Sequence, residues 1–272
     1  MPRWLDRLRG GSRRQRDIPD RLWQRTLANF PFLAAPGDAQ DHALRKMTRQ
    51  FLDEKEFDGA GGLVISDEIA VPIAAQACLP VLHLDAPYRG IDWYADFVGI
   101  VVHQGPVRAR REIVDDAGVV HQFDEELTGE AMQDGPVTLS WQDVRSAGST
   151  ARDGYNVVIH EFVHKIDMRN GPADGCPPLP PGFMGAATPS KARSLWRGTL
   201  DSHYQDFCDK CSIAERFGGA PPWLDPYGCT STSEFFAVAS EAYFVNREFF
   251  GRDFPVLLPL FDAFFRPSRV AG

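Results

Sequence analysis

The stretch "NVVIHEFVHKID", residues 156–167, limits the possible folds and chemistry of this chain most strongly. It places His160 and His164 four residues apart, with Glu161 directly after the first histidine. On a helix, side chains four residues apart lie on one face, about 6 Å from each other, so both imidazoles can reach one zinc ion at roughly 2.0–2.1 Å. Glu161 would flank that ion and accept a proton from a metal-activated water. The spacing therefore predicts a helix over residues 156–168 that carries a zinc site.

The apolar residues around this motif strengthen that interpretation. Phe162, Val163 and Ile166 would bury most of the helix around the polar side chains. Buried polar groups without partners cost on the order of 1–3 kcal/mol, so two core histidines with a glutamate between them form the weaker alternative. Asp167, three residues after His164, either accepts the second ring N–H of a ligand histidine or is an ordinary acid at the end of the helix.

A catalytic zinc ion takes three protein ligands and leaves one position open. The other histidines fit poorly, because they precede the motif in other predicted elements or lie on a charged helix: His42, His83, His103, His121 and His203. Glu234 and Glu241 lie seven residues apart in a predicted apolar helix over residues 232–246. They share one face and need partners if buried. One would bind the metal and the other would bond to a ligand histidine. Their spacing does not decide which does which, and Thr232 or Ser233 is expected to cap the helix.

The chain as a whole predicts an α+β fold in the order helices, sheet, helices. Residues 20–80 are predicted mostly helical, with a helix after Ser66 that Pro72 interrupts or bends. After residue 80, short β-branched and aromatic runs separated by turn residues predict a small, largely antiparallel sheet. These runs are "PVLHL", "WYADFVGIVVH", "VRARREIVDD" and "GPVTLSW". Helices then return at residues 156–168, 189–211 and 232–246, and the Pro- and Gly-rich residues 170–185 are predicted to form an exposed loop.

Charge and cysteine content exclude several classes of protein. The net charge of −8 and pI near 5.4 argue against nucleic-acid binding, which needs clustered Lys and Arg. Residues 1–19 are basic and predicted to be flexible. The chain shows neither a secretory h-region nor the roughly 18–20 apolar residues that span a bilayer, so we expect a cytoplasmic protein that does not act at a membrane. The five cysteines are scattered, which indicates no disulfide framework, and the Cys208-x-x-Cys211 pair is interpreted as two ordinary thiols on a helix.

Two blocks resemble a known family. "NVVIHEFVHKIDMRNG" and "DPYGCTSTSEFFAVASEAYF" are similar to the Mlc titration factor A family, zinc-dependent peptidases of the bacterial cytoplasm, and "GPVTLSWQDV" also resembles it. The resemblance extends over most of the chain from about residue 20. It implies a zincin-like fold, in which the motif helix packs beneath a mixed sheet whose edge strand lies above the metal. We expect "GPVTLSW" to be that edge, where an extended peptide can pair.

The resemblance also assigns residues that spacing leaves open. In this family, and in the similar catalytic domain of anthrax lethal factor, the third ligand is a glutamate with a tyrosine seven residues before it. Glu234 and Tyr227 have that spacing. The resemblance thus implies a gluzincin-like ligand set completed by Glu234, with Tyr227 donating to the developing oxyanion. Glu241 is then left to support a ligand, and Asp225 occupies an acidic position near the site.

Two functions follow as hypotheses. In the first, residues 20–272 form one catalytic domain, comprising a helical part (20–80), a sheet (81–150) and active-site helices (151–268), that hydrolyses peptides in the manner of an aminopeptidase. In the second, which rests on the resemblance, the chain binds and sequesters a Mlc-like transcriptional repressor that controls sugar uptake, and its peptidase activity is incidental. A purely structural zinc site is the weaker reading, because such sites are usually closed and rich in cysteine.

Overall fold

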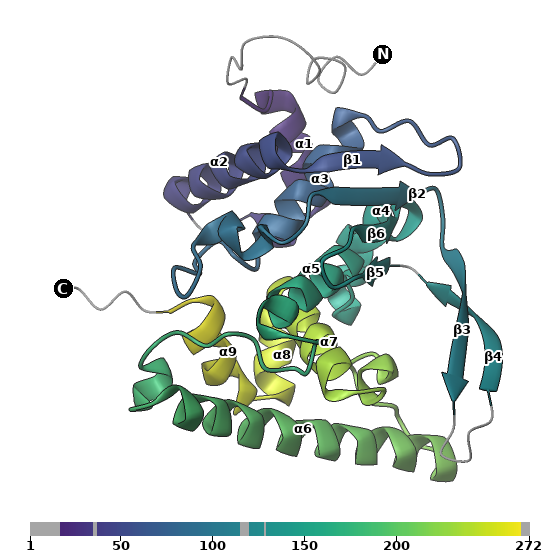
Figure 1. Cartoon of the computed structure of the whole chain (residues 1–272), viewed down its shortest axis with the longest axis vertical. Helices are drawn as coiled ribbons and strands as arrows, with labels where there is room; N and C mark the ends of the chain where they lie inside the picture. Colours follow the sequence, from purple (N-terminus) through teal and green to yellow (C-terminus); the bar gives the residue numbers. More distant parts are fainter. Residues whose placement is uncertain (1–16, 35–36, 115–119, 128, 268–272) are drawn as a thin grey trace.

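The computed structural model shows helices at both ends of the chain and a small mixed sheet between them (Figure 1). It describes residues 17–34, 37–114, 120–127 and 129–267. Of the basic segment predicted to be flexible, residues 1–19, residues 1–16 therefore lie outside the described residues. The fold is α+β and mostly helical, and the predicted order of helices, sheet and helices holds except that one strand, Glu56–Gly59, lies within the part predicted to be helical.

Three helices precede and flank the first strands: α1 (Asp20–Asn29), α2 (Asp38–Glu54) and α3 (Asp67–Cys78). Of the predicted break or bend at Pro72, the break is wrong, because α3 continues through this residue. Proline removes only the bond to the carbonyl of Glu68, which lies in the first turn of the helix. Every residue from Ile69 to Cys78 is buried, and α3 packs against α1, α2 and α5. Packing on all sides therefore holds this helix together.

The main sheet has the order β1 (Glu56–Gly59), β2 (Gly99–His103), β6 (Val137–Ser140) and β5 (Gly129–Ala131). β1, β2 and β6 are parallel, and only β5 runs antiparallel to its neighbour. The sheet is mixed, as the resemblance implies, and the expectation from the strand-like runs that it is largely antiparallel is wrong. No strand was predicted at β1, which pairs with β2 after the chain crosses over through α3, and such crossovers produce parallel pairs.

Two of the predicted strand segments have other structures. "PVLHL" forms no strand, and the start of "WYADFVGIVVH" belongs to a 3-10 helix, η3 (Gly90–Tyr94). Val81, Trp93 and Tyr94 are nevertheless fully buried. These runs are apolar because they fill the core, and a short apolar run does not by itself distinguish a strand from another buried segment.

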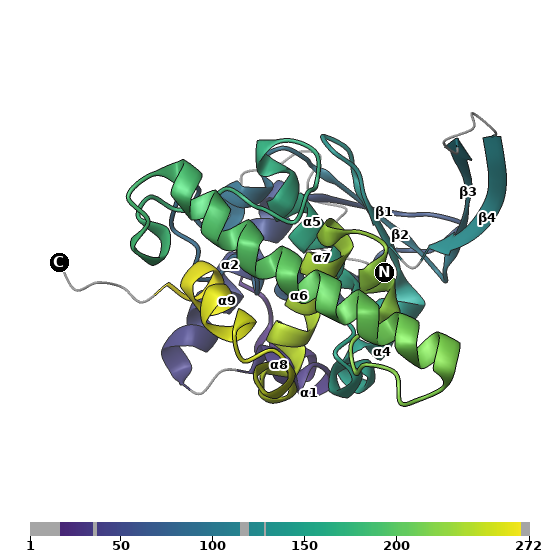
Figure 2. The same cartoon turned by 90° about the horizontal axis from the view of Figure 1, so that it is seen from below.

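The edge of the sheet is also not where the sequence placed it. β6, formed by the "GPVTLSW" segment, lies between β2 and β5, so the prediction that it is the edge is wrong. The outer strand on that side is β5, whose three residues are too few for a periodic signal. A separate antiparallel hairpin, β3 (Val107–Val114) and β4 (Val120–Leu127), projects from the body in both views (Figures 1 and 2).

The second half of the chain supplies the remaining helices. They are α4 (Trp141–Thr150), α5 (Val157–Asp167), α6 (Pro189–Phe217), α7 (Thr232–Val245), α8 (Arg247–Asp253) and α9 (Leu257–Phe265). The helices predicted at 156–168 and 232–246 are confirmed as α5 and α7. α6 continues six residues beyond the predicted end at 211, and it runs along one side of the molecule over α7 and α9 (Figure 2).

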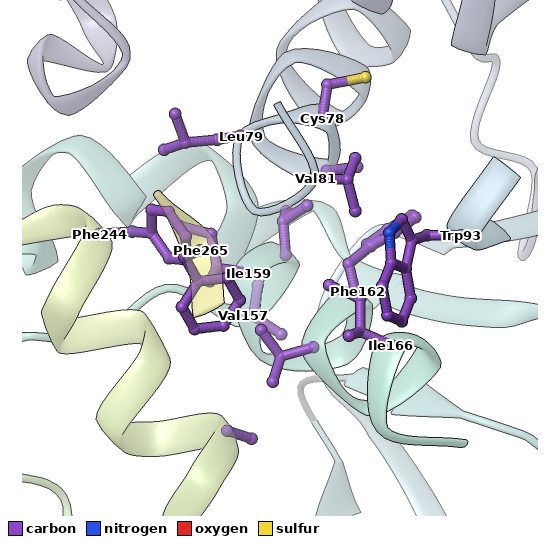
Figure 3. Packing of buried hydrophobic residues seen from close by; sticks show 14 of the residues in the cluster. Cys78, Leu79, Val81, Trp93, Val157, Ile159, Phe162, Ile166, Phe244 and Phe265 are labelled. Carbon is purple, nitrogen blue, oxygen red and sulfur yellow. The ribbon is translucent and has the colours of Figure 1, made fainter. Parts of the chain in front are cut away.

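Helix α5 lies at the centre of the core (Figure 3). It contacts α3, α7 and the strands β5 and β6. The ring of Phe162 packs on those of Phe51, Tyr94 and Phe97, with ring centroids 5.6, 5.0 and 5.9 Å away. Burying aromatic rings in this way is strongly stabilising. The polar face of α5 is therefore carried on a rigid support.

Candidate metal centre

Asn156 fixes the start of α5 and thus the position of its polar residues. Its side-chain Oδ1 accepts the N–H of Ile159 (2.9 Å), and its Nδ2 donates to Oε1 of Gln76 on α3 (2.8 Å). The first bond satisfies a backbone donor at the helix end, and the second ties that end to a neighbouring helix. His160 follows in the first turn of α5.

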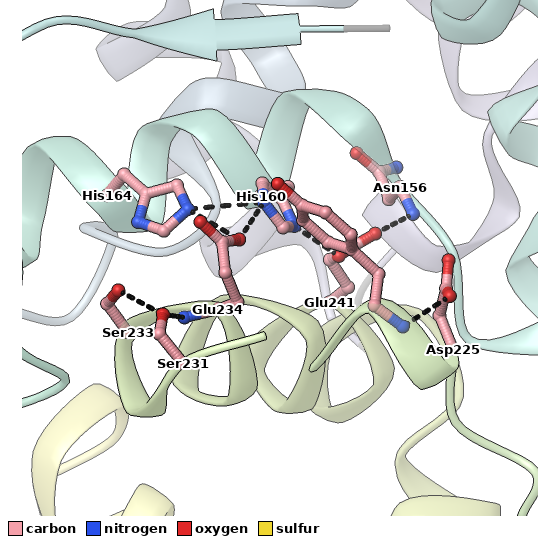
Figure 4. Close-up of polar contacts among 9 residues, drawn as sticks. Asn156, His160, His164, Asp225, Ser231, Ser233, Glu234 and Glu241 are labelled. Atoms are coloured by element: carbon pink, nitrogen blue, oxygen red, sulfur yellow. Dashed lines mark hydrogen bonds and ion pairs between the residues drawn. The ribbon is translucent and has the colours of Figure 1, made fainter. Parts of the chain in front are cut away.

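Helix α7 brings the second set of polar residues. Ser231 caps it by accepting the N–H of Glu234 at 3.2 Å, so the predicted cap at Thr232 or Ser233 is wrong by one or two residues. The Oγ of Ser233 instead bonds to that of Ser231 (2.8 Å). This cap places Glu234 in the first turn of α7, facing α5 (Figure 4).

Three ligand atoms converge between these helices. Nε2 of His160 lies 3.0 Å from Oε2 of Glu234, and Nε2 of His164 lies 3.1 Å from the same oxygen. The two Nε2 atoms are 3.2 Å apart. Ligands held tetrahedrally at 2.0–2.1 Å from zinc are separated by about 3.3 Å. Within the described part of the chain, this is the one group of three or more His, Cys, Asp or Glu residues whose ligand atoms are close enough to hold a metal ion.

Glu241 contacts the other ring nitrogen of His160, Nδ1 (Figure 4). Its Oε1 lies 2.7 Å from Nδ1 of His160, and its Oε2 accepts the backbone N–H of Asn156. A proton on Nδ1, shared with Glu241, leaves the lone pair of Nε2 directed at Glu234. The spacing of the two glutamates did not distinguish their roles, whereas here Glu234 contacts both histidines and Glu241 only one.

The charges in this cluster favour a cation. Burial lowers the pKa of His160, but Glu241 and Glu234 raise it more, so the net pKa lies well above the ordinary value. Burial raises the pKa of Glu234, but hydrogen bonds from both histidines bring it far below its usual range. The carboxylates of Glu234 and Glu241 thus favour a positive charge at the imidazoles. A divalent ion bound by the three converging atoms would supply that positive charge, so the donor set fits a metal.

Glu161 lies beside this cluster and is only 5% exposed. Burial raises its pKa to about 7, although His160 and His164 lower it. A carboxylate with a pKa near neutrality suits proton transfer. The backbone of Gly129 on β5 lies directly against it, since a Cβ added there would be 2.5 Å from Oε1 of Glu161.

Tyr227 and Asp225 lie on the approach to α7. Tyr227 belongs to the 3-10 helix η7 (Pro226–Cys229), and Oδ1 of Asp225 accepts its N–H at 2.9 Å. The tyrosine is 41% exposed, and its ring centroid lies 6.1 Å from that of His160. Asp225 therefore shapes the turn that holds Tyr227 next to the histidine pair.

Comparison with known proteins places the chain in a family. It matches the family model of the glucose-regulated metallo-peptidase M90 over residues 3–266. The chain belongs to this M90 family. Mlc titration factor A of Klebsiella pneumoniae subsp. pneumoniae is 32% identical over 250 residues, covering 92% of this chain and 87% of that protein. The protein of the same name from Serratia proteamaculans is also 32% identical over 250 residues, covering 92% and 88%.

Membership of the M90 family bears on two sequence interpretations. The resemblance to the Mlc titration factor A family is confirmed, and a metallo-peptidase family implies a metal cofactor, which agrees with the donor set of His160, His164 and Glu234. In the described ranges of this M90 chain, no helix is long and apolar enough to cross a membrane.

The side chain of Asp167 bonds to the Pro- and Gly-rich loop, residues 170–185. Its Oδ2 accepts the N–H of Gly175 at 2.7 Å, and its Oδ1 is buried with no hydrogen-bond partner among the described residues. Of the two roles considered for Asp167, a bond to a ligand histidine is not among the described contacts, and the bond to this loop is. Gly175 and Cys176 are buried, and Nε1 of Trp196 donates to the Gly175 carbonyl (2.6 Å). The prediction that residues 170–185 form an exposed loop is wrong for this part, because α5 and α6 both bind its backbone.

The burial of Asp167 predicts a pH-dependent stability. Burial raises its pKa from the ordinary 3.8 to about 7, so its penalty appears as pH rises between these values and is absent below 3.8. Asp167→Asn removes the charge and keeps an acceptor for Gly175. We expect it to raise the free energy of unfolding by on the order of 2–4 kcal/mol above the folded-state pKa. Below the ordinary value it should have little effect.

Urea unfolding at about pH 5 and about pH 8 measures this difference. Asp206→Asn, on the exposed surface of α6, is the matched control and should change stability equally at both pH values. A loss of stability in Asp167→Asn that is the same at both pH values would show that the buried carboxylate carries no such penalty.

Several supporting residues of this M90 site were not identified from the sequence. Asn156 had a usable signal, because it directly precedes an apolar helix, where N-caps occur. Ser231 preceded the two residues chosen as caps. Gln76 and Gly129 lie on other elements and gave no local signal, since only the packing of α3 and β5 on α5 brings them to the site.

Proposed function

We propose that the chain is a zinc-dependent peptidase with a zincin-like fold and a gluzincin-like ligand set of His160, His164 and Glu234. The observation that carries this proposal is the convergence of three ligand atoms, 3.0–3.2 Å apart, beside a buried glutamate. A closed structural site would use all four positions of the metal and would give Glu161 no role. Membership of the M90 family supports the same conclusion.

A zinc ion held by these residues would polarise a peptide carbonyl and lower the pKa of a water toward roughly 7. Glu161 is placed to accept a proton on its carboxylate from that water and to pass it to the leaving amine. The phenol of Tyr227 donates a hydrogen bond to the developing oxyanion, and Asp225 orients the turn that carries it.

The supporting residues keep these groups in place. Glu241 holds the ring of His160 through Nδ1, 2.7 Å from its Oε1, so that Nε2 would be free to bind a metal ion. An extended peptide substrate would pair with the outer strand β5, next to Glu161. We further propose that residues 20–272 act as one catalytic domain in the cytoplasm and that cleavage is aminopeptidase-like.

Zinc content together with cleavage of a panel of chromogenic amino-acid and peptide substrates tests this function. We expect about one zinc ion per chain, release of amino-terminal residues, and loss of activity with a chelator that zinc restores. A chain that carries zinc yet cleaves none of the substrates, at any chelator or zinc concentration, would contradict the proposal.

The printed names of the relatives support a second function. They are Mlc titration factor A proteins, and their name motivates the proposal that this chain also binds a Mlc-like repressor. A pull-down of such a repressor with wild type and His160→Ala separates the two functions. Binding by both proteins, with hydrolysis by wild type alone, would show that the functions are distinct. Binding by neither would remove the second function.

A further inference from the structure

Lys165 follows His164 on α5 and is completely buried. Its ammonium donates to the carbonyl oxygens of Met132 (2.8 Å) and Gly135 (3.3 Å), in the turn that joins β5 to β6. It also forms an ion pair with Oδ2 of Asp96 at 3.1 Å. Its three donors can therefore all be matched with oxygen acceptors, and two of these belong to one turn.

The contacts of the Lys165 ammonium explain why a lysine occupies this buried position. Removing an ammonium from water costs several kcal/mol before pairing, so an apolar side chain would fill the same space at lower cost. Lys165 also lies 4.4 Å above the ring of Phe97, and its partner Asp96 is held by Arg169 (3.3 Å). The Phe97 ring and Asp96 thus fix the position of the ammonium, which in turn bonds to the β5–β6 turn.

The other end of β5 meets the candidate site. Gly129 begins β5, and its backbone lies so close to Glu161 that an added Cβ would come within 2.5 Å of Oε1. Glu161 and Lys165 are four residues apart and lie on the same face of α5. β5 therefore contacts α5 at Glu161 near one end and at Lys165 just beyond the other.

We propose that Lys165 is a positioning residue that clamps the β5–β6 turn onto α5 and so sets the separation between β5 and Glu161. That separation determines the space in which a peptide backbone can lie between β5 and the metal ligands. The inference rests on the proposed peptidase function for its effect on catalysis, whereas the clamp itself follows from the contacts of Lys165.

Lys55 provides a matched control. It is also buried (4% exposed) and lies 4.4 Å above the same ring of Phe97. Its ammonium donates to the carbonyls of Tyr94 (2.5 Å) and Phe97 (2.6 Å) and makes no hydrogen bond to the β5–β6 turn among the described contacts. Lys55→Met and Lys165→Met each remove one buried ammonium beside Phe97, but only the second releases the turn.

The experiment compares these variants, loaded with zinc, by amide hydrogen exchange and peptide kinetics. We expect Lys165→Met to speed exchange in residues 129–135 by about tenfold and to lower kcat/KM by about tenfold, mainly through KM. Lys55→Met should leave both quantities within about twofold of wild type. Zinc content should be the same in all three proteins.

Equal changes in both variants, or unchanged exchange of residues 129–135 in Lys165→Met, would overturn the proposal. If Lys165→Met does not fold, Lys165→Gln takes its place, because the shorter side chain cannot reach both turn carbonyls; faster exchange of the same residues is expected, and unchanged exchange would overturn the clamp. If wild type cleaves no peptide, the proposed function fails, yet the exchange comparison still decides whether the clamp exists.

Discussion

Replacing Glu161 with glutamine is expected to reduce peptide hydrolysis by about 10²–10⁴-fold while leaving the bound metal in place. Glutamine has nearly the same shape and fits beside Gly129, but it cannot accept a proton at neutral pH. Glu161 supplies none of the three converging ligand atoms, so metal affinity should not depend on it. The loss should appear in kcat, because the carboxylate acts during the reaction.

Steady-state kinetics and metal analysis on the same preparation measure both quantities. Glu248→Gln, which alters an exposed glutamate of α8, is the control and should match wild type. Full hydrolysis by Glu161→Gln with metal bound would remove this residue from the mechanism.

The second large effect is expected from Glu234→Ala. This substitution removes the oxygen that lies 3.0 and 3.1 Å from the two histidine nitrogens, and with it the negative charge of the ligand set. Two imidazoles alone form an incomplete site for zinc. We therefore expect the purified variant to retain almost no metal after dialysis and to show no hydrolysis above background.

Glu241→Gln is the informative comparison for that result. Its amide oxygen can still accept the proton of Nδ1 of His160, so the metal should remain but bind more weakly, by about 10–100-fold. Titration with zinc in the presence of a competing chelator measures both variants. Loss of the metal in Glu241→Gln together with tight binding in Glu234→Ala would exchange the roles of the two glutamates.

The motif on α5 was predictable because its geometry is local. His160, Glu161 and His164 need only helical spacing to be placed, and the strong apolar pattern around them indicates that helix. Glu234 and Glu241 were found as a pair for the same reason. Their separate roles depend on where α7 crosses α5, which the resemblance to a family supplied and spacing could not.

The sheet and the residues that support the site depend on tertiary packing. β5 has three residues, and no pattern in them shows that they lie on α5 beyond β6. From the sequence, Lys165 would be predicted to lie on the surface, because lysine is almost never fully buried without a partner. Its partners in the β5–β6 turn and at Asp96 are distant in sequence, so its burial emerges only from the fold.

A crystal structure of the wild-type chain with zinc, phased or checked by the anomalous signal of the metal, tests the central claim most directly. We predict one strong anomalous peak at roughly 2.0–2.2 Å from Nε2 of His160, Nε2 of His164 and a carboxylate oxygen of Glu234. No peak between α5 and α7 at saturating zinc, with Glu234 turned away from the histidines, would contradict it.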